Sequence, residues 1–376
     1  MNFELSDEQE LIRRTVREFA GTKVAPVAEE LDREERFPYE LVAELGELGL
    51  MGLPIPEKYG GAGGDTVSYA IAIEELTRID SSVAITLAAH TSLGTMPIYL
   101  FGNEEQKQEW LPRLASGQGL AAFGLTEPDA GSDAGATRTK AELRDGEWVI
   151  DGSKIFITNA GTDLSACVTI TALTGEGEIS NIVVPNGTAG YEISAPMHKL
   201  GWHASDTREL SFHSCAVPEG NLLGDRGRGF RQFMEILDGG RISVASMGVG
   251  LAQGAFDQAL AYARERQAFG QPIARFQAIA GRLADMATEV EAARLLTYKA
   301  ALLKDSKRPF ALAAAQAKLK SGLVAVDVVD QAVQIHGGYG YIEEYPVCRF
   351  YRDAKILTIG EGTDEIQRLV IARALV

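Results

Sequence analysis

Apolar residues recur at helical spacing over the first third of the chain. Ser6 and Gln9 form a capping-box pattern, and apolar residues three or four apart follow as far as Phe19. Asn103 and Gln106 repeat this start signal for a later helix. The stretch 54–65, rich in glycine and proline, interrupts the pattern and predicts a loop. We expect residues 1–120 to form an N-terminal all-α domain.

The pattern changes near residue 120, where short runs of β-branched and aromatic residues replace the helical spacing. Asp145-Gly146 and Asp151-Gly152 are typical of hairpin turns between such runs. Residues 121–225 are therefore predicted to form a small, mostly antiparallel β domain. Its expected strands are Glu147–Ile150, Lys154–Thr158, Ala166–Thr171, Ile179–Val184 and Glu209–Phe212.

Helical spacing returns in the last part of the chain, residues 226–376. Long helices are predicted at 230–266, 276–304 and 309–336, and many of their residues are Ala, Gly or Ser. Small side chains let helices approach closely, which favours a helical bundle. The order helices, strands, helices excludes an alternating βαβ sheet, so the predicted fold class is α+β.

Length and charge limit the function classes. A chain of 376 residues is longer than one hydrophobic core usually supports, which agrees with three domains. Its 36 basic and 52 acidic side chains give a net charge of −16, which argues against a nucleic-acid-binding surface. An anionic ligand would need local basic groups or backbone N–H donors.

Cysteine and histidine usage predicts no metal site. The three cysteines lie far apart without metal-ligand spacing, which favours reduced thiols in a cytoplasmic protein. The five histidines form no His-x-x-x-His pair. Met1 to Glu4 lack the basic and apolar segments of a signal peptide, and we expect no transmembrane segment.

Two segments of the β region carry candidate ligand-binding groups. Phe123 to Asp133 is dense in turn residues and hydroxyls, so it is either a surface loop or a loop that cradles a ligand. Phe156 to Asn159 ends a predicted strand with an aromatic, a hydroxyl and an amide. It either buries the aromatic ring and caps the strand, or it packs that ring against a planar heterocycle.

Three glycine-containing segments of the C-terminal region are also ambiguous. Asp238-Gly239-Gly240-Arg241 marks either a close helix crossing or a thinned backbone beside a ligand. Arg266 to Gly270 is either a helix stop or a site for a phosphate and a flat ring. Gln334 to Tyr341 is either a C-cap or a diphosphate cradle.

Gly360-Glu361-Gly362 places a carboxylate between two glycines after the long helices end. Alone, it is typical of an exposed turn. The usual nucleotide-binding signatures, the Walker A motif and the Gly-x-Gly-x-x-Gly turn after a strand, are absent. A nucleotide cofactor would therefore have to bind by other means.

Taken together and in this order, these segments resemble the acyl-CoA dehydrogenase family over essentially the whole chain. Leu237 to Ile242 and Arg282 to Met286 are most similar to the short-chain and short branched-chain members. The resemblance implies an N-terminal helical domain, a middle β domain and a C-terminal four-helix bundle. It also implies non-covalent FAD, a homotetramer built as a dimer of dimers, and electron transfer to an electron-transferring flavoprotein.

The resemblance also assigns residues. Glu361 matches the catalytic base, and Ser132, Asp238, Arg241 and Gly362 match acyl-CoA contacts. Thr158 would hydrogen-bond the flavin edge near N5, and the segments around Arg266 and Gln334 would contact the adenosine diphosphate half, partly across the dimer interface. The implied FAD-contacting residues are Phe123, Leu125, Thr126, Gly131, Ser132, Phe156, Ile157, Thr158, Arg266, Phe269, Gln277, Gln334, Ile335, Gly337, Gly338, Thr363 and Glu365.

The implied chemistry suits these residue types. An α-proton of a thioester is weakly acidic, so its removal needs a desolvated base and a donor to the developing enolate. Glu361 would supply the base and its own backbone N–H a donor, while the β-hydrogen leaves as hydride to flavin N5. Burial should raise the pKa of Glu361 toward the working pH.

Two positions distinguish this chain within the family. Some members carry the base on the helix that here has Gly240, so glycine there and Glu361 in the loop favour the loop base. Phe156 stands where many members carry tryptophan beside the flavin. We predict a short-chain or branched short-chain acyl-CoA dehydrogenase of fatty acid β-oxidation or branched-chain amino acid catabolism.

Two rival functions remain. An acyl-CoA oxidase would let O₂ reoxidise the flavin, but such oxidases usually carry a further C-terminal domain, whereas this chain ends soon after Gln367-Arg368. A non-catalytic flavin- or CoA-binding module on the same scaffold would be expected to lose the base, and Glu361 is present.

Overall fold

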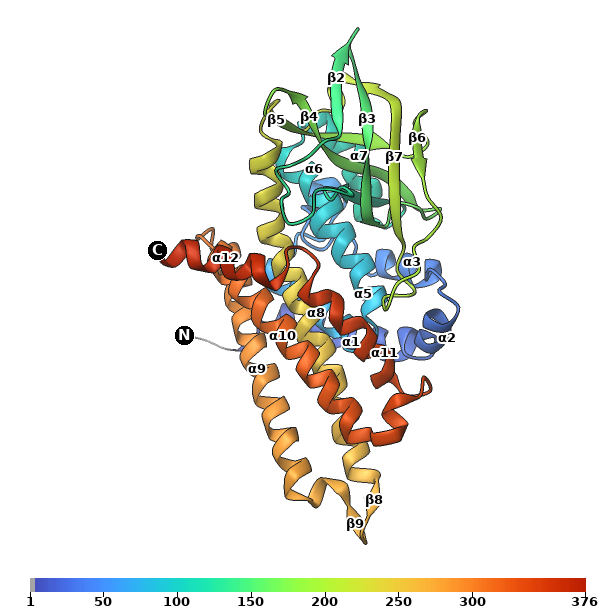
Figure 1. The fold of residues 1–376 in the computed structure, drawn as a ribbon, viewed down its shortest axis with the longest axis vertical. Coiled ribbons are helices and arrows are strands. Elements are labelled where there is room, and N and C mark those ends of the chain that lie inside the picture. The colour runs from blue at the N-terminus through green and yellow to red at the C-terminus, as the bar shows by residue number, and fades with distance from the viewer. Residues whose placement is uncertain (1–3) are drawn as a thin grey trace.

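The computed structural model describes residues 4–376, so the sequence interpretation of Met1 to Phe3 lies outside the described residues. The strands lie at one end of the molecule, the early helices pack beside them, and three long helices run toward the opposite end (Figure 1). The N-terminal helices are α1 (Asp7–Phe19), α2 (Ala28–Arg33), α3 (Tyr39–Glu47), α4 (Thr66–Thr77), α5 (Ser81–Ala88), α6 (Met96–Phe101) and α7 (Glu104–Ala115).

The two predicted helix starts are confirmed. Ser6 and Gln9 form a complete capping box at α1, and Asn103 and Gln106 form another at α7. In each pair the two side chains accept from two backbone N–H groups that a helix start leaves without partners. The short α2 was not predicted, because it spans only Ala28–Arg33 and has no side-chain cap.

His90 joins this helical region to the first strand. It lies in a π-helical segment, Ala89–Thr95, and is fully buried. Its Nδ1 accepts the backbone N–H of Ala121 at 3.1 Å, and its Nε2 lies 3.0 Å from the carbonyl oxygen of Leu114. The ring is therefore neutral with its proton on Nε2, and burial lowers the pKa of His90 to about 4.

One helical stretch in the described residues, Ser81–Phe101, is long and apolar enough to cross a membrane. Of its most apolar window, 78% is buried inside the protein. Because its apolar side chains already face the protein core, length and composition are weak support for a membrane span here.

The β domain is a seven-stranded sheet of order β1-β4-β2-β3-β7-β6, with β5 paired to β4. The predicted strand region is confirmed, but the sheet is mixed, because β1 and β2 each pair with β4 in parallel. The strands are β1 (Leu120–Gly124), β2 (Lys140–Arg144), β3 (Glu147–Thr158), β4 (Ser165–Gly175), β5 (Glu178–Pro185), β6 (Tyr191–Ile193) and β7 (Thr207–Pro218).

One of the two predicted turns is confirmed and the other is wrong. Asp145 and Gly146, both at positive φ, form the two-residue turn between β2 and β3. Asp151-Gly152 does not end a strand, because β3 continues through it to Thr158. Gly152 instead forms an irregularity in the pairing with β7, at φ 149° and against Thr139.

The C-terminal region is a bundle built on α8 (Gly229–Glu265), α9 (Gln277–Asp305) and α10 (Ala311–His336), which confirms the predicted long helices. A two-stranded turn, β8 (Gln267–Ala268) and β9 (Gln271–Pro272), links α8 to α9. A Cβ at Gly248 would lie 2.9 Å from the backbone of Ser321 on α10, so the glycine permits close helix packing, as predicted.

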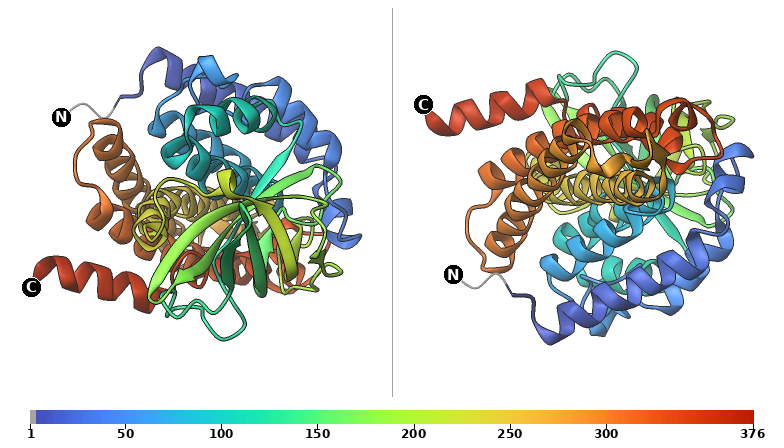
Figure 2. Two further views of the ribbon diagram at one scale, coloured as in Figure 1. Left: turned by 90° about the horizontal axis from the view of Figure 1, so that it is seen from above. Right: turned by 90° about the horizontal axis from the view of Figure 1, so that it is seen from below.

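Two shorter helices complete the bundle. The first, α11 (Pro346–Ala354), packs on α10 and α8. The second, α12 (Asp364–Leu375), starts against α10 and then projects away from the body (Figure 2). Only Asp364 and Gln367 of α12 are buried. The loop between these two helices carries Glu361 into the interior beside α8.

Candidate active site

Glu361 occupies a strained loop between the short helix Lys355–Thr358 and α12. Its φ is 51°, and that of Gly362 is 92°. Positive φ is uncommon for a residue other than glycine and is often found at functional sites. The carboxylate oxygen Oε2 is buried and has no hydrogen-bond partner. A buried acceptor without a partner costs free energy, which indicates that this oxygen is kept for a ligand.

Gly240 on α8 provides the space for this carboxylate. A Cβ at position 240 would lie 2.0 Å from Glu361 Oε2, closer than real Cβ atoms approach. Any other residue at 240 would therefore displace the carboxylate. The thinned backbone at Gly240 faces the Glu361 carboxylate, and its contact with a ligand stays a prediction.

The electrostatics at Glu361 favour a base that works near neutrality. Burial raises the pKa of Glu361 to about 7, and the positive charges of Lys318 and Arg241 oppose this rise. A carboxylate with such a pKa can both remove a proton and hold it near physiological pH. The predicted rise in the pKa of this group is confirmed.

Arg241 and Asp238 lie beside each other on α8. Arg241 is 2% exposed and forms an ion pair with Asp238, while its Nε has no partner. Arg241 thus faces inward and acts on Glu361 through its charge, a role that sequence reasoning did not assign. Contact of either residue with acyl-CoA stays a prediction.

A buried ion pair between Glu127 and Lys154 anchors the loop that follows β1. Glu127 accepts from Lys154 Nζ at 2.7 Å and from the backbone N–H groups of Arg138 and Thr139 at 2.7 and 3.1 Å. Gly131 and Ser132 at its tip are exposed. The sequence offered no signal for this anchor, because lysine is usually exposed.

The end of β3 presents an aromatic ring to solvent. Phe156 is 64% exposed at φ 62°, whereas Ile157 is buried and Thr158 pairs with Thr207 of β7. The chain does not bury the Phe156 ring, so the alternative of an inward-packed ring is wrong. Packing of the ring against a planar ligand stays a prediction.

A third group of predicted residues lies at the far end of the bundle. Phe269 is 96% exposed at φ 50°, and Arg266 lies over the ring of Tyr339 at 5.6 Å. Of the other predicted residues of this group, Ile335 is buried, and the exposed ones are Gln277, Gln334, Gly337 and Gly338. Lys318, which contacts the Glu361 loop, and Gln334 are sixteen residues apart on α10, which corresponds to about 24 Å.

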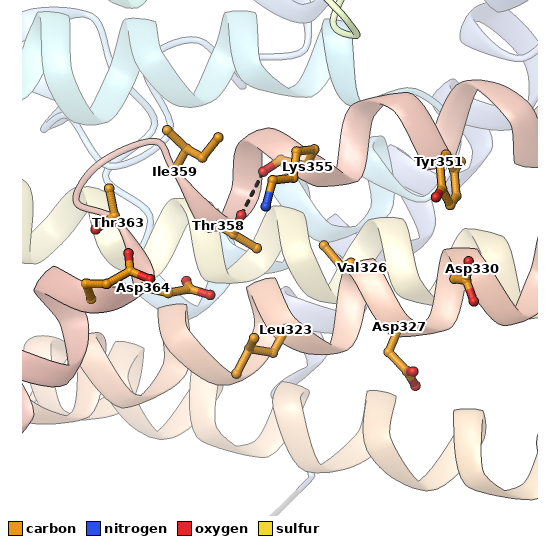
Figure 3. Close-up of a pocket in the computed structure, with 11 residues that line it drawn as sticks. Leu323, Val326, Asp327, Asp330, Tyr351, Lys355, Thr358, Ile359, Thr363 and Asp364 are labelled. Atoms are coloured by element: carbon orange, nitrogen blue, oxygen red, sulfur yellow. Dashed lines mark hydrogen bonds between the residues drawn. The ribbon is translucent and has the colours of Figure 1, made fainter.

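A groove of about 510 Å³ runs along the outer side of the base loop (Figure 3). It is lined by residues of α10, α11 and the start of α12, including the predicted cofactor residues Thr363 and Glu365. Glu361 does not line it. Among the described residues, no group of three or more His, Cys, Asp and Glu could hold a metal ion.

Family models match all three parts of the chain. The N-terminal, middle and C-terminal domains of acyl-CoA dehydrogenase match residues 6–118, 122–215 and 227–376. The chain belongs to the acyl-CoA dehydrogenase family. Its members are flavoprotein oxidoreductases of fatty acid oxidation. A buried carboxylate oxygen without a hydrogen-bond partner suits this class of enzyme.

Curated relatives cover the whole chain. A probable acyl-CoA dehydrogenase of Bacillus subtilis is 53% identical over 380 residues and covers 100% of both chains. A short-chain specific acyl-CoA dehydrogenase of Clostridium acetobutylicum is 49% identical over 374 residues and covers 99% of both. The relatives thus support acyl-CoA dehydrogenation as the activity.

Solved structures agree in fold. The butyryl-CoA dehydrogenase of Megasphaera elsdenii has a TM-score of 0.97 at 44% identity and full coverage of both chains. A chain from a study of the electron transferring flavoprotein of Acidaminococcus fermentans has a TM-score of 0.98 at 45% identity, also with full coverage. An acyl-CoA dehydrogenase of Bacillus anthracis complexed with FAD has a TM-score of 0.94 at 37% identity, covering 99% of this chain and 67% of that one.

Proposed function

We propose that this acyl-CoA dehydrogenase oxidises a short-chain or short branched-chain acyl-CoA to the trans-2-enoyl-CoA, with Glu361 as the base. The observation that carries the proposal is the buried Glu361 oxygen without a partner, set against the space at Gly240. The short-chain names of the C. acetobutylicum relative and the M. elsdenii structure support this substrate class.

Glu361 would remove the α-proton of the thioester. Its raised pKa, about 7, lets the carboxylate accept that proton without a large energetic mismatch. Among the described residues, the backbone N–H of Glu361 donates to no carbonyl oxygen. This N–H is available to stabilise the oxygen on which negative charge develops.

The residues of the site fit FAD. Phe156 presents an exposed ring beside Thr158, and the exposed tip at Gly131 and Ser132 offers backbone and hydroxyl donors. These side chains would hold the isoalloxazine ring and its ribityl chain. When bound there, FAD supplies the acceptor for the β-hydride at flavin N5.

The adenosine half of FAD would be held by a second copy of the chain. Gln334 lies about 24 Å along α10 from Lys318, which contacts the base loop. The β8–β9 turn, which holds Phe269 and follows Arg266, lies at this far end of the bundle (Figure 1). Exposed arginine and aromatic groups suit a diphosphate and an adenine ring. We propose a homotetramer of two dimers in which the groove beside Thr363 and Glu365 meets this end of the partner chain.

The proposed electron acceptor is an electron-transferring flavoprotein. The similarity to a chain from the A. fermentans study supports this partner. A cytoplasmic location is proposed from the three free cysteines. The oxidase alternative predicts that O₂ replaces the flavoprotein, and a non-catalytic module predicts no reaction at all.

Anaerobic mixing with acyl-CoA thioesters tests the reaction. The holoprotein is mixed with butyryl-CoA, isobutyryl-CoA and octanoyl-CoA, and flavin absorbance is followed. We expect rapid bleaching with the two short thioesters. No bleaching with any thioester would overturn the proposal, and rapid recolouring in air without an acceptor would favour the oxidase.

Mixed assemblies test the shared cofactor site. Chains carrying Glu361→Gln and chains carrying Arg266→Ala are each expected to be inactive, the second through loss of FAD. When the two are co-expressed, one site of each mixed dimer has both native residues, so activity should return. If all groups at a site came from one chain, the mixed dimers would stay inactive.

A further inference from the structure

Lys318 on α10 is a buried cation directly beneath the base loop. Its side chain is 0% exposed, its Nζ donates to the carbonyl oxygen of Gly362 at 2.8 Å, and it lies 3.6 Å from Asp364 Oδ1. A buried ammonium group is costly unless its donors are used and its charge is compensated. Here the segment that carries Glu361 supplies one acceptor through Gly362 and a compensating charge through Asp364.

The Lys318 contact restrains a backbone that local preference does not favour. Glu361 has a φ of 51°, which is uncommon for a residue other than glycine and which a free loop would relax. Gln367, fully buried on α12, donates to the carbonyl oxygens of Glu361 and Gly362 at 3.3 and 3.0 Å. Gln367 ties the loop to its own following helix, whereas Lys318 ties it to α10.

Three packed helices, α4, α8 and α10, supply the titratable groups that interact with Glu361. Lys318 of α10 and Arg241 of α8 are cations that favour the carboxylate, and Tyr69 of α4 is a buried hydroxyl that senses its charge. Asp238 is paired with Arg241, and Asp364 is paired with Lys318. Loss of Lys318 would leave Arg241 as the one cation opposing the effect of burial on Glu361 among the described groups.

We infer that Lys318 is a positioning residue for the base: it fixes the backbone of the Glu361 loop and keeps the Glu361 carboxylate ionised for proton abstraction. This inference rests on the proposed function, because Glu361 is taken as the base. The Lys318 side chain is fully buried by the chain itself. It acts through the Gly362 carbonyl group and through its charge.

Replacing Lys318 tests the electrostatic part of this role. In Lys318→Met, which lacks donor and charge, the acid limb of the flavin-reduction rate should move to higher pH by about one unit, with about a fivefold loss near pH 7 and about a tenfold loss well below it. Lys318→Gln should show the same displacement, because it also lacks the charge. Lys318→Arg should restore the position of the limb.

The matched control is Lys320→Met, two residues along the same helix, where Lys320 is partly exposed and paired with Glu289. It should keep the native rate and acid limb. A native acid limb in Lys318→Met or Lys318→Gln would overturn the inference. If neither of these variants folds, an acid limb displaced in Lys318→Arg would overturn it, since that variant keeps the charge.

A second readout separates this inference from the proposed reaction. The carboxyl C=O stretch of Glu361, assigned by difference from Glu361→Gln, reports ionisation without turnover. It should titrate near pH 7 in the native holoprotein and at higher pH in Lys318→Met. An unchanged titration would overturn the inference even if acyl-CoA thioesters bleach the flavin.

Discussion

Two lysines are fully buried, and their surroundings differ. Lys154 in the β domain has its Nζ 2.7 Å from Glu127 and 3.0 Å from the hydroxyl of Thr171. Burial lowers the pKa of Lys154 to about 8, and Glu127 opposes this fall. The carboxylate partner also accepts two backbone N–H groups, so its lone pairs are used. This cluster is closed and serves as an anchor.

The cluster around Lys318 is open by contrast. Glu361 Oε2, Asp364 Oδ1 and Arg241 Nε are all buried without a hydrogen-bond partner. The chain itself satisfies none of these three atoms, whereas Lys154 and Glu127 both have hydrogen-bond partners. This difference fits Lys154 as part of the scaffold and supports the proposed chemical role of Glu361.

The largest expected effect is on the open cluster. Glu361→Gln removes the base but keeps the shape of the side chain, so the rate of flavin reduction should fall by about 10²–10⁴ while flavin content is unchanged. Glu344→Gln, at an exposed position, is the control. Stopped-flow reduction measures the rate, and near-native reduction in Glu361→Gln would place the base elsewhere.

The closed cluster should fail through stability. Lys154→Met leaves Glu127 buried without its cation, which should cost about 3–5 kcal/mol of unfolding free energy. Chemical denaturation of the holoprotein measures this, with the exposed Lys140→Met as control. The comparison breaks down if Lys154→Met unfolds at the native midpoint and loses only catalytic rate.

Gly240→Ala tests whether the Glu361 carboxylate needs the space that glycine leaves at position 240. The added Cβ would collide with Glu361 Oε2 and push the carboxylate from its position, so flavin reduction should slow by roughly tenfold to a hundredfold. Gly239→Ala is the matched control, because its Cβ meets only the flexible end of Lys304 at 3.2 Å. Equal rates in the two variants would contradict the assigned role of Gly240.

The smallest expected effect is the dependence of rate on pH. The base is active when ionised, and the pKa of Glu361 is raised to about 7. The rate should therefore increase with pH through about 7 and fall about tenfold per pH unit well below it. Stopped-flow reduction across this range measures it, and a flat profile would show that ionisation of Glu361 does not limit the reaction.

Signals carried by neighbouring residues predicted the fold well. The capping boxes at Ser6 and Asn103 and the turn at Asp145-Gly146 depend on residues within three positions, and all are confirmed. The turn at Asp151-Gly152 was wrong because pairing with β7 carries β3 through the glycine. The parallel pairing of β1 with β4 joins distant segments and leaves no local trace.

The residues of the candidate site also divide into those that the sequence predicted and those that it missed. The roles of Glu361 and Gly240 were assigned through the family resemblance, and the fold places the two residues against each other. Lys318 and Lys154 were missed because their partners lie 44 and 27 residues away in sequence. A lysine in a helix or strand pattern gives no sign of burial, since burial is decided by which elements pack over it.

His90 makes the junction between the helical domain and β1 a point of acid weakness. Protonation would turn Nδ1 into a donor that faces the backbone N–H of Ala121, which is also a donor. The hydrogen bond at the start of β1 would then be lost. The pKa of His90 is lowered to about 4, so this contact is lost as the pH falls toward 4. Since β1 ends at Gly124, directly before the loop of Thr126 and Ser132, flavin release measured in an acid titration should rise toward that pH.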